Sequence, residues 1–557
     1  MVVPTLAKQT IQNLYLHSVE TYSDEVAFSY VDEGAYTFAE VDRQSTALAK
    51  ALRRLGLAKG DRVALLAENG PVWSIVYLTV AALGAVVVPI LPDFHKSEIH
   101  HIIRNAGCRI LFISSRLAHK VSEIRSKEMD WVAAMDNGPL PLDQLNVVNI
   151  RDLIEGAFPQ KKKEPHPLRF PVEEDDLAEI LYTSGTTGHS KGVMLTHKNI
   201  VSNALSAVRM IELSHDDRLV SILPQSHAYE CTCGFLAPFM QGAKVYYIKG
   251  LPTAQTLLPA VQKVKPTHIL SVPLIMEKIY KKKVLAEINA RSFSKMAYKI
   301  TPKLIYKIAG KKLYQAFGGK LKIMIFGGAA MPLEVEEFLN EAGFPYISGY
   351  GLTEASPLLT VNPVGHVKKQ SAGKAVPSVN IRIVDVDPET GIGEIQAKGP
   401  NIMKGYYKNE EATQKAITKD GWLITGDRGY VDEEGYLFIK GRSKNLIVGS
   451  SGENIYPEEI EFHLSQSPYV LESLVYEKEG RIVARVHPDY DALEQHFHIS
   501  TLDGSQAVKT IEKLLEEIRA EVNDKVAGYS RIHKIIEQSE EFEKTPTKKI
   551  KRYLYTD

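Results

Sequence analysis

The chain contains one loop whose residue types and spacing suit the binding of a polyphosphate. It runs through Thr183, Ser184, Gly185, Thr186, Thr187 and Gly188, and Lys191 follows it. Glycine lets the backbone approach a ligand closely, so main-chain N–H groups can point at anionic oxygens, while hydroxyls and a lysine add donors and positive charge. We expect this loop, which lies between a strand-like run and a helix-like run, to hold a nucleotide triphosphate.

The spacing differs from that of the common GxxxxGK[ST] phosphate loop. Lys191 stands six residues after Gly185, and Gly192 follows it in place of serine or threonine. A different nucleotide-binding fold is therefore expected. Taken alone, the loop could equally be a surface turn rich in serine, threonine and glycine.

Three further segments favour the phosphate-binding interpretation over a surface turn. They are the run at 321–326 followed by Gly327-Gly328-Ala329 and then Tyr350-Gly351-Leu352-Thr353-Glu354; Thr425-Gly426-Asp427 with Gly441-Arg442-Ser443-Lys444; and residues 544–552, which include Lys549. In this order, over about residues 10 to 552, the motifs resemble those of the adenylate-forming superfamily. That superfamily includes acyl-CoA synthetases, firefly luciferases and the adenylation domains of nonribosomal peptide synthetases.

The resemblance implies a binding site for ATP. Its contacts to adenine and ribose would come from Gly327, Gly328, Ala329, Tyr350, Gly351, Asp427 and Arg442. The two glycines would lie against adenine, the tyrosine would stack on it, and the aspartate and arginine would hold the ribose hydroxyls, for which a carboxylate is a natural acceptor. Alone, an aspartate beside a glycine is more often a turn residue.

The resemblance also implies catalytic groups. Glu354 would supply an oxygen ligand for Mg²⁺, Thr353 a hydroxyl for the α-phosphate, and Ser184 a second metal contact. Lys549 would hold positive charge where a carboxylate attacks the α-phosphate. Lys548 stands where the family's lysine motif usually has glycine, so the choice of Lys549 depends on its alignment. A solvated basic tail is the alternative for these lysines.

The segment 223–230 indicates the class of acid. It resembles that of long- and medium-chain fatty acyl-CoA synthetases, and it lacks the Phe-Asp pair of amino-acid-activating domains. His227 would lie near the substrate carboxylate, with Glu230 beside it. Fatty acid activation with ATP, Mg²⁺ and coenzyme A is therefore expected. The alternatives are an acyl-AMP ligase or acyl-carrier-protein synthetase, and a non-catalytic acyl- or nucleotide-binding relative; no motif excludes a luciferase-like oxygenation.

Composition agrees with a globular enzyme of more than one domain. The 557 residues include 67 Lys or Arg and 67 Asp or Glu, so no global charge favours nucleic acid. Three cysteines do not make a disulfide framework. No secretory signal is visible, and residues 73–92, although long and uncharged, are interpreted as a buried helix, a glycine turn and a buried strand. A cytoplasmic protein is expected.

Strand-like runs alternate with helix-like segments, as at 220–224, 243–248, 268–272 and 323–326, which predicts an α/β fold. The resemblance implies a large N-terminal domain of layered sheets and helices, residues 1–441, and a small mobile α+β domain, residues 442–557. Lys444 would be the hinge. Rotation there would withdraw Lys549 after the first half-reaction and bring the turn at 449–452 toward the thiol. Residues 385–393 are interpreted as a hairpin turn.

A basic stretch stands out in this neutral chain. Residues 278–322 contain twelve lysines and Arg291 against a single carboxylate, Glu287. Lysines recur at 295, 299, 303, 307 and 311, and apolar residues at 297, 304, 305 and 308 fall roughly in the remaining arc, although Pro302 interrupts the pattern. A solvated lysine face is one interpretation, and peripheral contact of a helix with an anionic membrane is the other.

Overall fold

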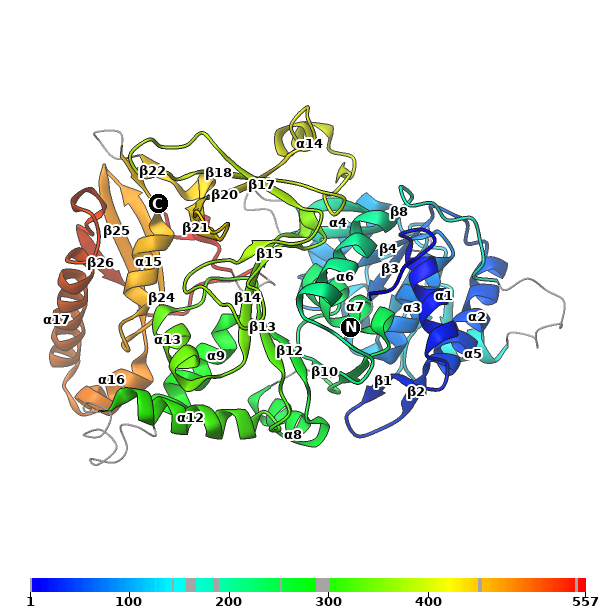
Figure 1. Cartoon of the computed structure of the whole chain (residues 1–557), viewed down its shortest axis with the longest axis horizontal. Helices are drawn as coiled ribbons and strands as arrows, with labels where there is room; N and C mark the ends of the chain where they lie inside the picture. Colours follow the sequence, from blue (N-terminus) through cyan, green and yellow to red (C-terminus); the bar gives the residue numbers. More distant parts are fainter. Residues whose placement is uncertain are drawn as a thin grey trace.

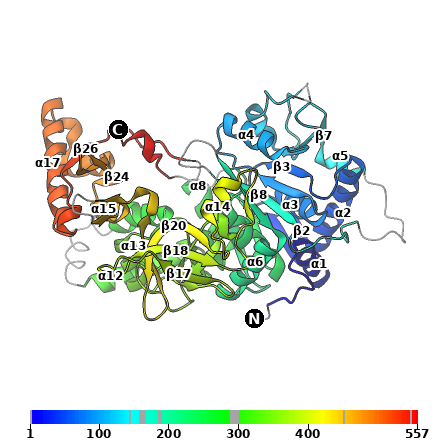
Figure 2. The same ribbon diagram turned by 90° about the horizontal axis from the view of Figure 1, so that it is seen from above.

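The structure is a computed structural model that describes residues 3–125, 127–142, 145–156, 167–183, 190–250, 253–286, 301–448, 453–545 and 549–556. Most of the chain forms two large sheets with helices packed around them, and the C-terminal residues form a smaller body at one end (Figures 1 and 2). The predicted α/β class and its division into a large and a small part are confirmed. The boundary at 441/442 stays a prediction.

The first large sheet is parallel at its centre. Its order is β16-β15-β14-β13-β12-β10-β11-β1-β2 among the described residues, with antiparallel pairing only for β2, β15 and β16. The strands are β1 (Val26–Tyr30), β2 (Ala35–Thr37), β10 (Arg218–Ser221), β11 (Lys244–Tyr247), β12 (His268–Ser271), β13 (Ile323–Phe326), β14 (Tyr346–Gly351), β15 (Leu358–Val361) and β16 (Lys374–Ala375). Open α/β sheets bind ligands at the carboxyl ends of their strands, which directs attention to the residues after β12, β13 and β14.

The second large sheet carries the predicted phosphate loop. Its order is β19-β9-β8-β4-β3-β5-β6-β7 in the described part of the chain. The strands are β3 (Arg62–Leu66), β4 (Val86–Pro89), β5 (Ile110–Ile113), β6 (Trp131–Ala134), β7 (Val147–Asn149), β8 (Leu177–Thr183), β9 (Lys191–Thr196) and β19 (Gly405–Tyr406).

The environment of the loop corrects one prediction. β8 and β9 are antiparallel, with Thr183 opposite Lys191, so the loop joins two strands and a strand, not a helix, follows it directly. Helix α6 (His197–Met210) begins only after β9. A short apolar run does not distinguish strand from helix by its periodicity, and pairing with β8 and β19 decides the outcome here.

One hydrophobic core joins the two large sheets through the helices packed with them. The helices of the larger part are α1 (Ile11–Thr21), α2 (Phe38–Arg54), α3 (Pro71–Ala82), α4 (Lys96–Ala106), α5 (Ile150–Glu155), α6, α7 (Ala237–Gln241), α8 (Ala254–Val264), α9 (Pro273–Ile279), α12 (Pro302–Ala316), α13 (Leu333–Ala342) and α14 (Glu410–Ala416). Shorter helical turns are η1 (Ser115–Lys120), η2 (Glu230–Leu236), η3 (Tyr280–Leu285), η4 (Thr353–Ala355) and η5 (Ser443–Asn445). The core includes Phe28 of β1, Val63 of β3, Trp73 of α3 and Phe235 of η2.

The long uncharged run at 73–92 folds as predicted. Helix α3 is buried on all sides, Gly84 adopts a positive φ of 74°, and β4 is fully buried. A helix that is apolar all round belongs in a protein interior or a membrane, and here it is covered by α1, α2 and β4. In the part of the chain that the structure describes, no helix is both long and apolar enough to cross a membrane.

A four-stranded antiparallel sheet follows the first large sheet in the chain. It consists of β17 (Asn380–Val384), β18 (Gly393–Lys398), β20 (Leu423–Val431) and β21 (Leu437–Arg442). The predicted hairpin turn at 385–393 connects β17 to β18. Asp427 of β20 is the register partner of Arg442 at the end of β21, so this sheet places two predicted site residues opposite each other.

The smaller C-terminal body has its own sheet and core. The sheet consists of β24 (Val470–Lys478), β25 (Arg481–Pro488) and β26 (Lys534–Glu537); α15 (Pro457–Ser465), α16 (Tyr490–Phe497), α17 (Gly504–Asn523), η6 (Ile499–Thr501), η7 (Gly528–Ser530) and η8 (Arg552–Leu554) accompany it. A two-stranded ribbon, β22 (Ile447–Val448) and β23 (Asn454–Ile455), leads into it. Its buried cluster, which includes Ile460, Val486 and Leu515, is separate from the larger core.

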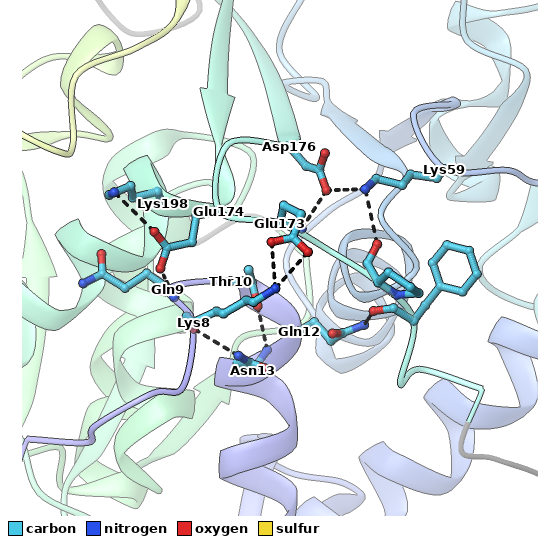
Figure 3. Close-up of polar contacts among 12 residues, drawn as sticks. Lys8, Gln9, Thr10, Gln12, Asn13, Lys59, Glu173, Glu174, Asp176 and Lys198 are labelled. Atoms are coloured by element: carbon cyan, nitrogen blue, oxygen red, sulfur yellow. Dashed lines mark hydrogen bonds and ion pairs between the residues drawn. The ribbon is translucent and has the colours of Figure 1, made fainter.

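The N-terminal segment contacts the residues that directly precede β8. Lys8 forms an ion pair with Glu173 at 2.7 Å, and the N–H of Gln9 donates to Glu174 (Figure 3). Lys59, which precedes β3, pairs with Asp176 at 2.5 Å in the same short segment. Because Asp176 directly precedes β8, these contacts hold the strand that carries the phosphate loop.

The described part of the basic stretch corrects the sequence-based helix. α12 begins at Pro302, with Thr301 at its N-cap. Proline fits the first turn of a helix but removes a hydrogen bond from the interior, so the lysine pattern does not continue through it. The predicted positions 295, 297 and 299 lie outside the described residues.

Candidate active site

The predicted adenine-binding residues lie at the carboxyl ends of adjacent parallel strands. Gly327, Gly328 and Ala329 follow β13, and Tyr350 and Gly351 end β14. Gly328 and Ala329 are exposed, whereas Gly327 is buried. The structure thus presents an uncovered stretch of backbone at the edge where open α/β sheets bind ligands.

Two glycines in this region lie at close approaches, a tight one at Gly327 and a much closer one at Gly351. A Cβ atom on Gly327 would lie 3.2 Å from the ring of Tyr229, whose hydroxyl donates to the carbonyl of Ile325. A Cβ atom on Gly351 would lie 2.0 Å from the backbone oxygen of Pro357. Real Cβ atoms do not approach backbone so closely, so the turn after β14 depends on glycine at 351.

Three of the predicted residues form one polar cluster. The Tyr350 hydroxyl donates to Oδ2 of Asp427 at 2.6 Å, and Nε of Arg442 lies 2.8 Å from Oδ1 of Asp427. Burial raises the pKa of Asp427, and the charge of Arg442 opposes that rise. Arg442 itself is exposed, so the cluster has a buried carboxylate with a cation on its open side.

Glu354 and Lys191 both contact Tyr406, a residue that the sequence analysis did not identify. The Tyr406 hydroxyl donates to Oε1 of Glu354 at 2.8 Å, and Nζ of Lys191 lies 5.0 Å from the centroid of the Tyr406 ring. Tyr406 occupies this position because β19 pairs with β9, opposite Val193. No spacing in the sequence reveals a pairing between such distant segments.

The remaining phosphate-side residues are only partly described. Thr353 and Glu354 lie in η4, immediately after β14. Thr183 and Lys191 mark the two ends of the loop. The predicted positions from Ser184 to Gly188 lie outside the described residues, so the structure places the base of the phosphate loop and the acidic and hydroxyl groups near it.

His227 is held in a desolvated position near the same site. Its Nδ1 accepts from the N–H of Tyr229 at 3.2 Å, and desolvation lowers its pKa to about 4, with the charge of Lys549 acting in the same direction. The ring is therefore neutral at pH 7.

The prediction that Glu230 lies beside the substrate carboxylate is not supported. Glu230 is 1% exposed and accepts from Ser221 at 2.6 Å, and a Cβ atom on Gly234 would touch its carboxyl group. Burial raises its pKa to about 8. The residue starts the helical turn η2, which turns its side chain toward the interior.

Lys549 reaches the cluster from the far end of the chain. The charges of Arg442, Asp427 and Glu354 influence the pKa of its ammonium group. The charge of Lys549 in turn influences the pKa of His227. Desolvation lowers the pKa of Lys549, with Arg442 adding to the effect. The structure thus brings together residues that follow β10 and β14, residues of β20 and β21, and one residue from the C-terminal segment.

Two contacts anchor the segment that carries Lys549. Arg552 pairs with Glu461 of α15 at 2.7 Å and also donates to the carbonyl of Val475 in β24. The N–H of Lys549 donates to Thr545 at 3.1 Å. The C-terminal body therefore positions the segment that carries Lys549. In Figure 2 the end of the chain, drawn in red, extends from that body toward the larger part.

Lys444 lies apart from this cluster. It is exposed in η5, between Ser443, which bonds to Glu394, and Asn445, which bonds to Glu458. These neighbours tie η5 to β18 on one side and to α15 on the other. Its role as a hinge stays a prediction, and the predicted turn at 449–452 lies outside the described residues.

The residues of this site could bind Mg²⁺ only together with the phosphates of a bound nucleotide. Among the described residues no group of three or more His, Cys, Asp or Glu side chains gathers as a metal site. Mg²⁺ is commonly bound by one or two carboxylates together with substrate phosphates. Glu354, with one oxygen held by Tyr406 and with the phosphate loop nearby, fits that pattern.

Comparisons with known proteins agree with this arrangement. A long-chain-fatty-acid–CoA ligase of Bacillus subtilis is 29% identical over 575 residues, covering 98% of this chain and 94% of that protein. A 4-coumarate–CoA ligase of Pinus taeda is 29% identical over 518 residues, covering 90% and 86%. A solved structure of an anthranilate CoA ligase with anthranoyl-AMP shares the fold, with a TM-score of 0.79 and 22% identity over 99% of this chain and 97% of that one.

The family comparison covers the large part of the structure. Residues 16–407 match the family described as AMP-binding enzyme. That range includes the phosphate loop, both large sheets, and the residues that follow β13 and β14. The chain therefore belongs to the AMP-binding enzyme family.

Proposed function

We propose that this protein joins a fatty acid to coenzyme A in two steps. In the first, the acid's carboxylate attacks the α-phosphate of ATP, an acyl-adenylate forms and pyrophosphate leaves. In the second, the thiol of coenzyme A attacks the acyl carbon and AMP leaves. The observation that carries the proposal is electrostatic: the charges of Asp427 and Glu354 act to raise the pKa of Lys549, and the charge of Lys549 lowers the pKa of His227.

In the first step two anions must approach each other. Lys549 supplies positive charge where the carboxylate meets the α-phosphate, and a preorganised cation in a desolvated site stabilises charge better than water does. Arg442, paired with Asp427, contributes to the ribose site. Asp427 and Tyr350 hold the ribose and the base, which fixes the α-phosphate in front of the acid. Thr353 donates its hydroxyl to the same phosphate.

The leaving pyrophosphate is held on the other side of the site. Lys191 and the loop before it bind its oxygens. Glu354 would hold Mg²⁺, which would supply positive charge to offset that of the departing pyrophosphate. Tyr406 fixes the orientation of Glu354 and supports the lysine with its ring.

The second step requires Lys549 to leave. The thiol must reach the acyl carbon from the side that the C-terminal segment covers, so the small body rotates about Lys444. The four-stranded sheet, with Asp427 and Arg442, stays with the nucleotide. This assignment of domains and hinge follows the family resemblance and the separate core of the C-terminal body.

The charge state near the acid favours a substrate without an amino group. An α-ammonium needs an anionic partner, whereas His227, the residue that we assign to the acid, is neutral at pH 7. A simple carboxylic acid fits this neighbour. A relative that covers 98% of this chain acts, by its name, on long-chain fatty acids, which supports the choice among acids.

The test is a panel of acids from acetate to oleate, with 4-coumarate included, assayed for pyrophosphate and for thioester with ATP, Mg²⁺ and coenzyme A. We expect the highest kcat/KM with long-chain acids and one thioester for each pyrophosphate released. Higher kcat/KM with 4-coumarate would contradict the fatty acid assignment. Pyrophosphate release that stalls after one turnover with coenzyme A present would indicate a carrier-protein acceptor.

A further inference from the structure

Helix α12 presents an unusual exposed face. Leu304 is 56% exposed and Ile308 is 50% exposed, one helical turn apart. Both are large aliphatic side chains that a protein surface normally covers when they are adjacent. The helix lies along the lower edge of the molecule in Figure 1 and remains at the periphery in Figure 2.

Lysines flank this aliphatic pair. At 3.6 residues per turn, Lys307 and Lys311 lie on one side of the pair and Lys312 on the other, and all three are exposed. The sequence of α12 has no acidic residue. Within the described residues Lys307 and Lys311 form no ion pair, whereas Lys303 meets Glu341 at 3.3 Å. The face is therefore both apolar and positively charged.

A hollow of about 390 Å³ lies next to these lysines. Lys307 and Lys311 border it, and Tyr314, Leu321 and Phe344 contribute to its walls. Opposite α12 it is closed by residues 342–345, the connection from α13 to β14. An apolar wall with two ammonium groups at its rim matches a molecule that has an anionic head and an apolar body.

The opposite face of α12 is fixed in the protein. Leu313 is buried, Gly310 packs against Ala342, and the Tyr306 hydroxyl bonds to that of Tyr280 at 2.9 Å. These contacts hold one face of α12 against the protein. A small movement of the helix would therefore not bury Leu304 and Ile308.

We propose that this face of α12 docks the protein reversibly on an anionic lipid bilayer. Leu304 and Ile308 enter the boundary between headgroups and acyl chains, and Lys307, Lys311 and Lys312 contact anionic headgroups, one of which sits in the hollow. A helix with an aliphatic stripe and lysines on both sides is suited to lie in such an interface. The occupant is inferred from this charge complementarity, and the inference does not depend on the catalytic proposal.

The experiment is co-sedimentation of the full chain with vesicles of phosphatidylcholine, with and without phosphatidylglycerol. We expect binding only with phosphatidylglycerol, and weaker binding at high salt. The double variant Lys307→Glu and Lys311→Glu should lose at least about tenfold in partitioning, since each lysine near an anionic surface contributes about a tenfold factor or less. The variant Leu304→Ser and Ile308→Ser should also bind more weakly.

The matched control is Lys509→Glu with Lys513→Glu, which makes the same charge change at the same spacing on α17. Both of these lysines are exposed, and we expect vesicle binding within about twofold of the parent chain, because a remote site loses only general attraction. Pyrophosphate release with a short soluble acid should stay unchanged in all variants, which shows that they fold.

Three results would overturn the proposal. The first is equal binding to vesicles with and without phosphatidylglycerol. The second is equal loss in the α12 and α17 charge variants, which would indicate general attraction only. The third is binding of soluble glycerol 3-phosphate, measured by calorimetry, without binding to either kind of vesicle; that result would assign the hollow to a soluble anion.

Discussion

Tyr406 connects two charged residues from distant parts of the chain. Its hydroxyl orients Glu354 and its ring lies beside the ammonium of Lys191. A residue that touches both groups controls their relative position without contacting the acid itself. Its contribution should therefore appear in the rate of the first step and not in the stability of the fold.

Replacing Tyr406 with phenylalanine tests this role. The variant keeps the ring and loses a hydrogen bond to a carboxylate, which is worth about 1.5–3 kcal/mol, so we expect kcat for adenylate formation to fall about tenfold or more. Tyr407→Phe is the control, since that hydroxyl lies 3.5 Å from the carbonyl of Ala106. Equal rates for the two variants would show that Tyr406 does not position Glu354.

Glu179 makes a prediction about pH and stability. It is 2% exposed in β8, accepts from Tyr77 at 3.1 Å, and burial raises its pKa to about 8. The unfolded chain ionises near the ordinary value of about 4.3. Because the folded pKa is raised, this group's contribution to stability is fully present below pH 4.3 and is lost as pH rises toward 8, at up to about 1.4 kcal/mol per pH unit.

Glu179→Gln removes that dependence. We expect the variant to gain stability relative to the parent at pH 8 and to gain little or none at pH 5, as measured by urea unfolding at both values. The exposed Glu433 offers a control, and Glu433→Gln should change stability by less than about 0.5 kcal/mol at either pH. A Glu179→Gln effect that does not change with pH would mean that the carboxyl group is not protonated in the folded state.

At the scale of elements, the site depends on how strands end. The end of β14 carries Tyr350, the turn after it carries Thr353 and Glu354, and Gly351 between them lets the chain pass close to Pro357. A side chain there would push the two backbones apart. The nucleotide and phosphate sides of the site would then separate together, because both lie within a few residues of Gly351.

Gly351→Ala should therefore remove activity more than stability. The added Cβ would meet backbone oxygen at 2.0 Å, and we expect at least a hundredfold loss in pyrophosphate release together with about 1–3 kcal/mol of destabilisation. Gly504→Ala at the start of α17, where nothing lies within 4 Å, is the control. Full activity in Gly351→Ala would show that the turn tolerates displacement.

Sequence patterns predicted some elements well and others poorly. The strand-like runs predicted at 243–248, 268–272 and 323–326 contain β11, β12 and β13, and the helix predicted after residue 73 is α3. The run predicted at 220–224 overlaps only the last two residues of β10. The strand after the phosphate loop was mistaken for helix, because its pairing with β8 and β19 is a long-range property. The start of α12 at Pro302 was visible as an interruption but not as a boundary.

The site shows the same division. Motif residues such as Asp427, Arg442 and Glu354 could be named because their types and order are characteristic of a family. Tyr406 could not, since only the tertiary pairing of β19 brings it to Glu354. The burial of Glu230 was not predicted, because the direction of a side chain in a helical turn depends on packing, which one sequence does not reveal.

At the scale of the whole molecule, the proposal requires two arrangements of the C-terminal body. The arrangement described here places Lys549 in the site. On the outer side, Lys282 of η3 lies 3.8 Å from Asp491 of α16, and Lys281 donates to the carbonyl of Ser465 in α15. The Lys282–Asp491 pair is exposed and contributes little free energy, so this pair does not prevent rotation.

A cross-link between the two parts tests the rotation. Lys282→Cys and Asp491→Cys, joined by a short bis-maleimide, should retain adenylate formation and lose thioester formation, since Lys549 could no longer withdraw. The native cysteines at 108, 231 and 233 are buried and should not react. The doubly substituted protein without cross-linker is the control, and full thioester turnover after cross-linking would contradict the two-arrangement account.

The central claim is that Lys549 acts on the α-phosphate in the first step. The most direct measurement is single-turnover formation of acyl-adenylate from a long-chain acid and ATP, without coenzyme A, in Lys549→Ala and in Lys551→Ala. Lys551 lies two residues further along and pairs with Glu543 at 3.3 Å. We predict a loss of about a hundredfold or more for Lys549→Ala and less than about threefold for Lys551→Ala. Equal rates in the two variants would contradict the account.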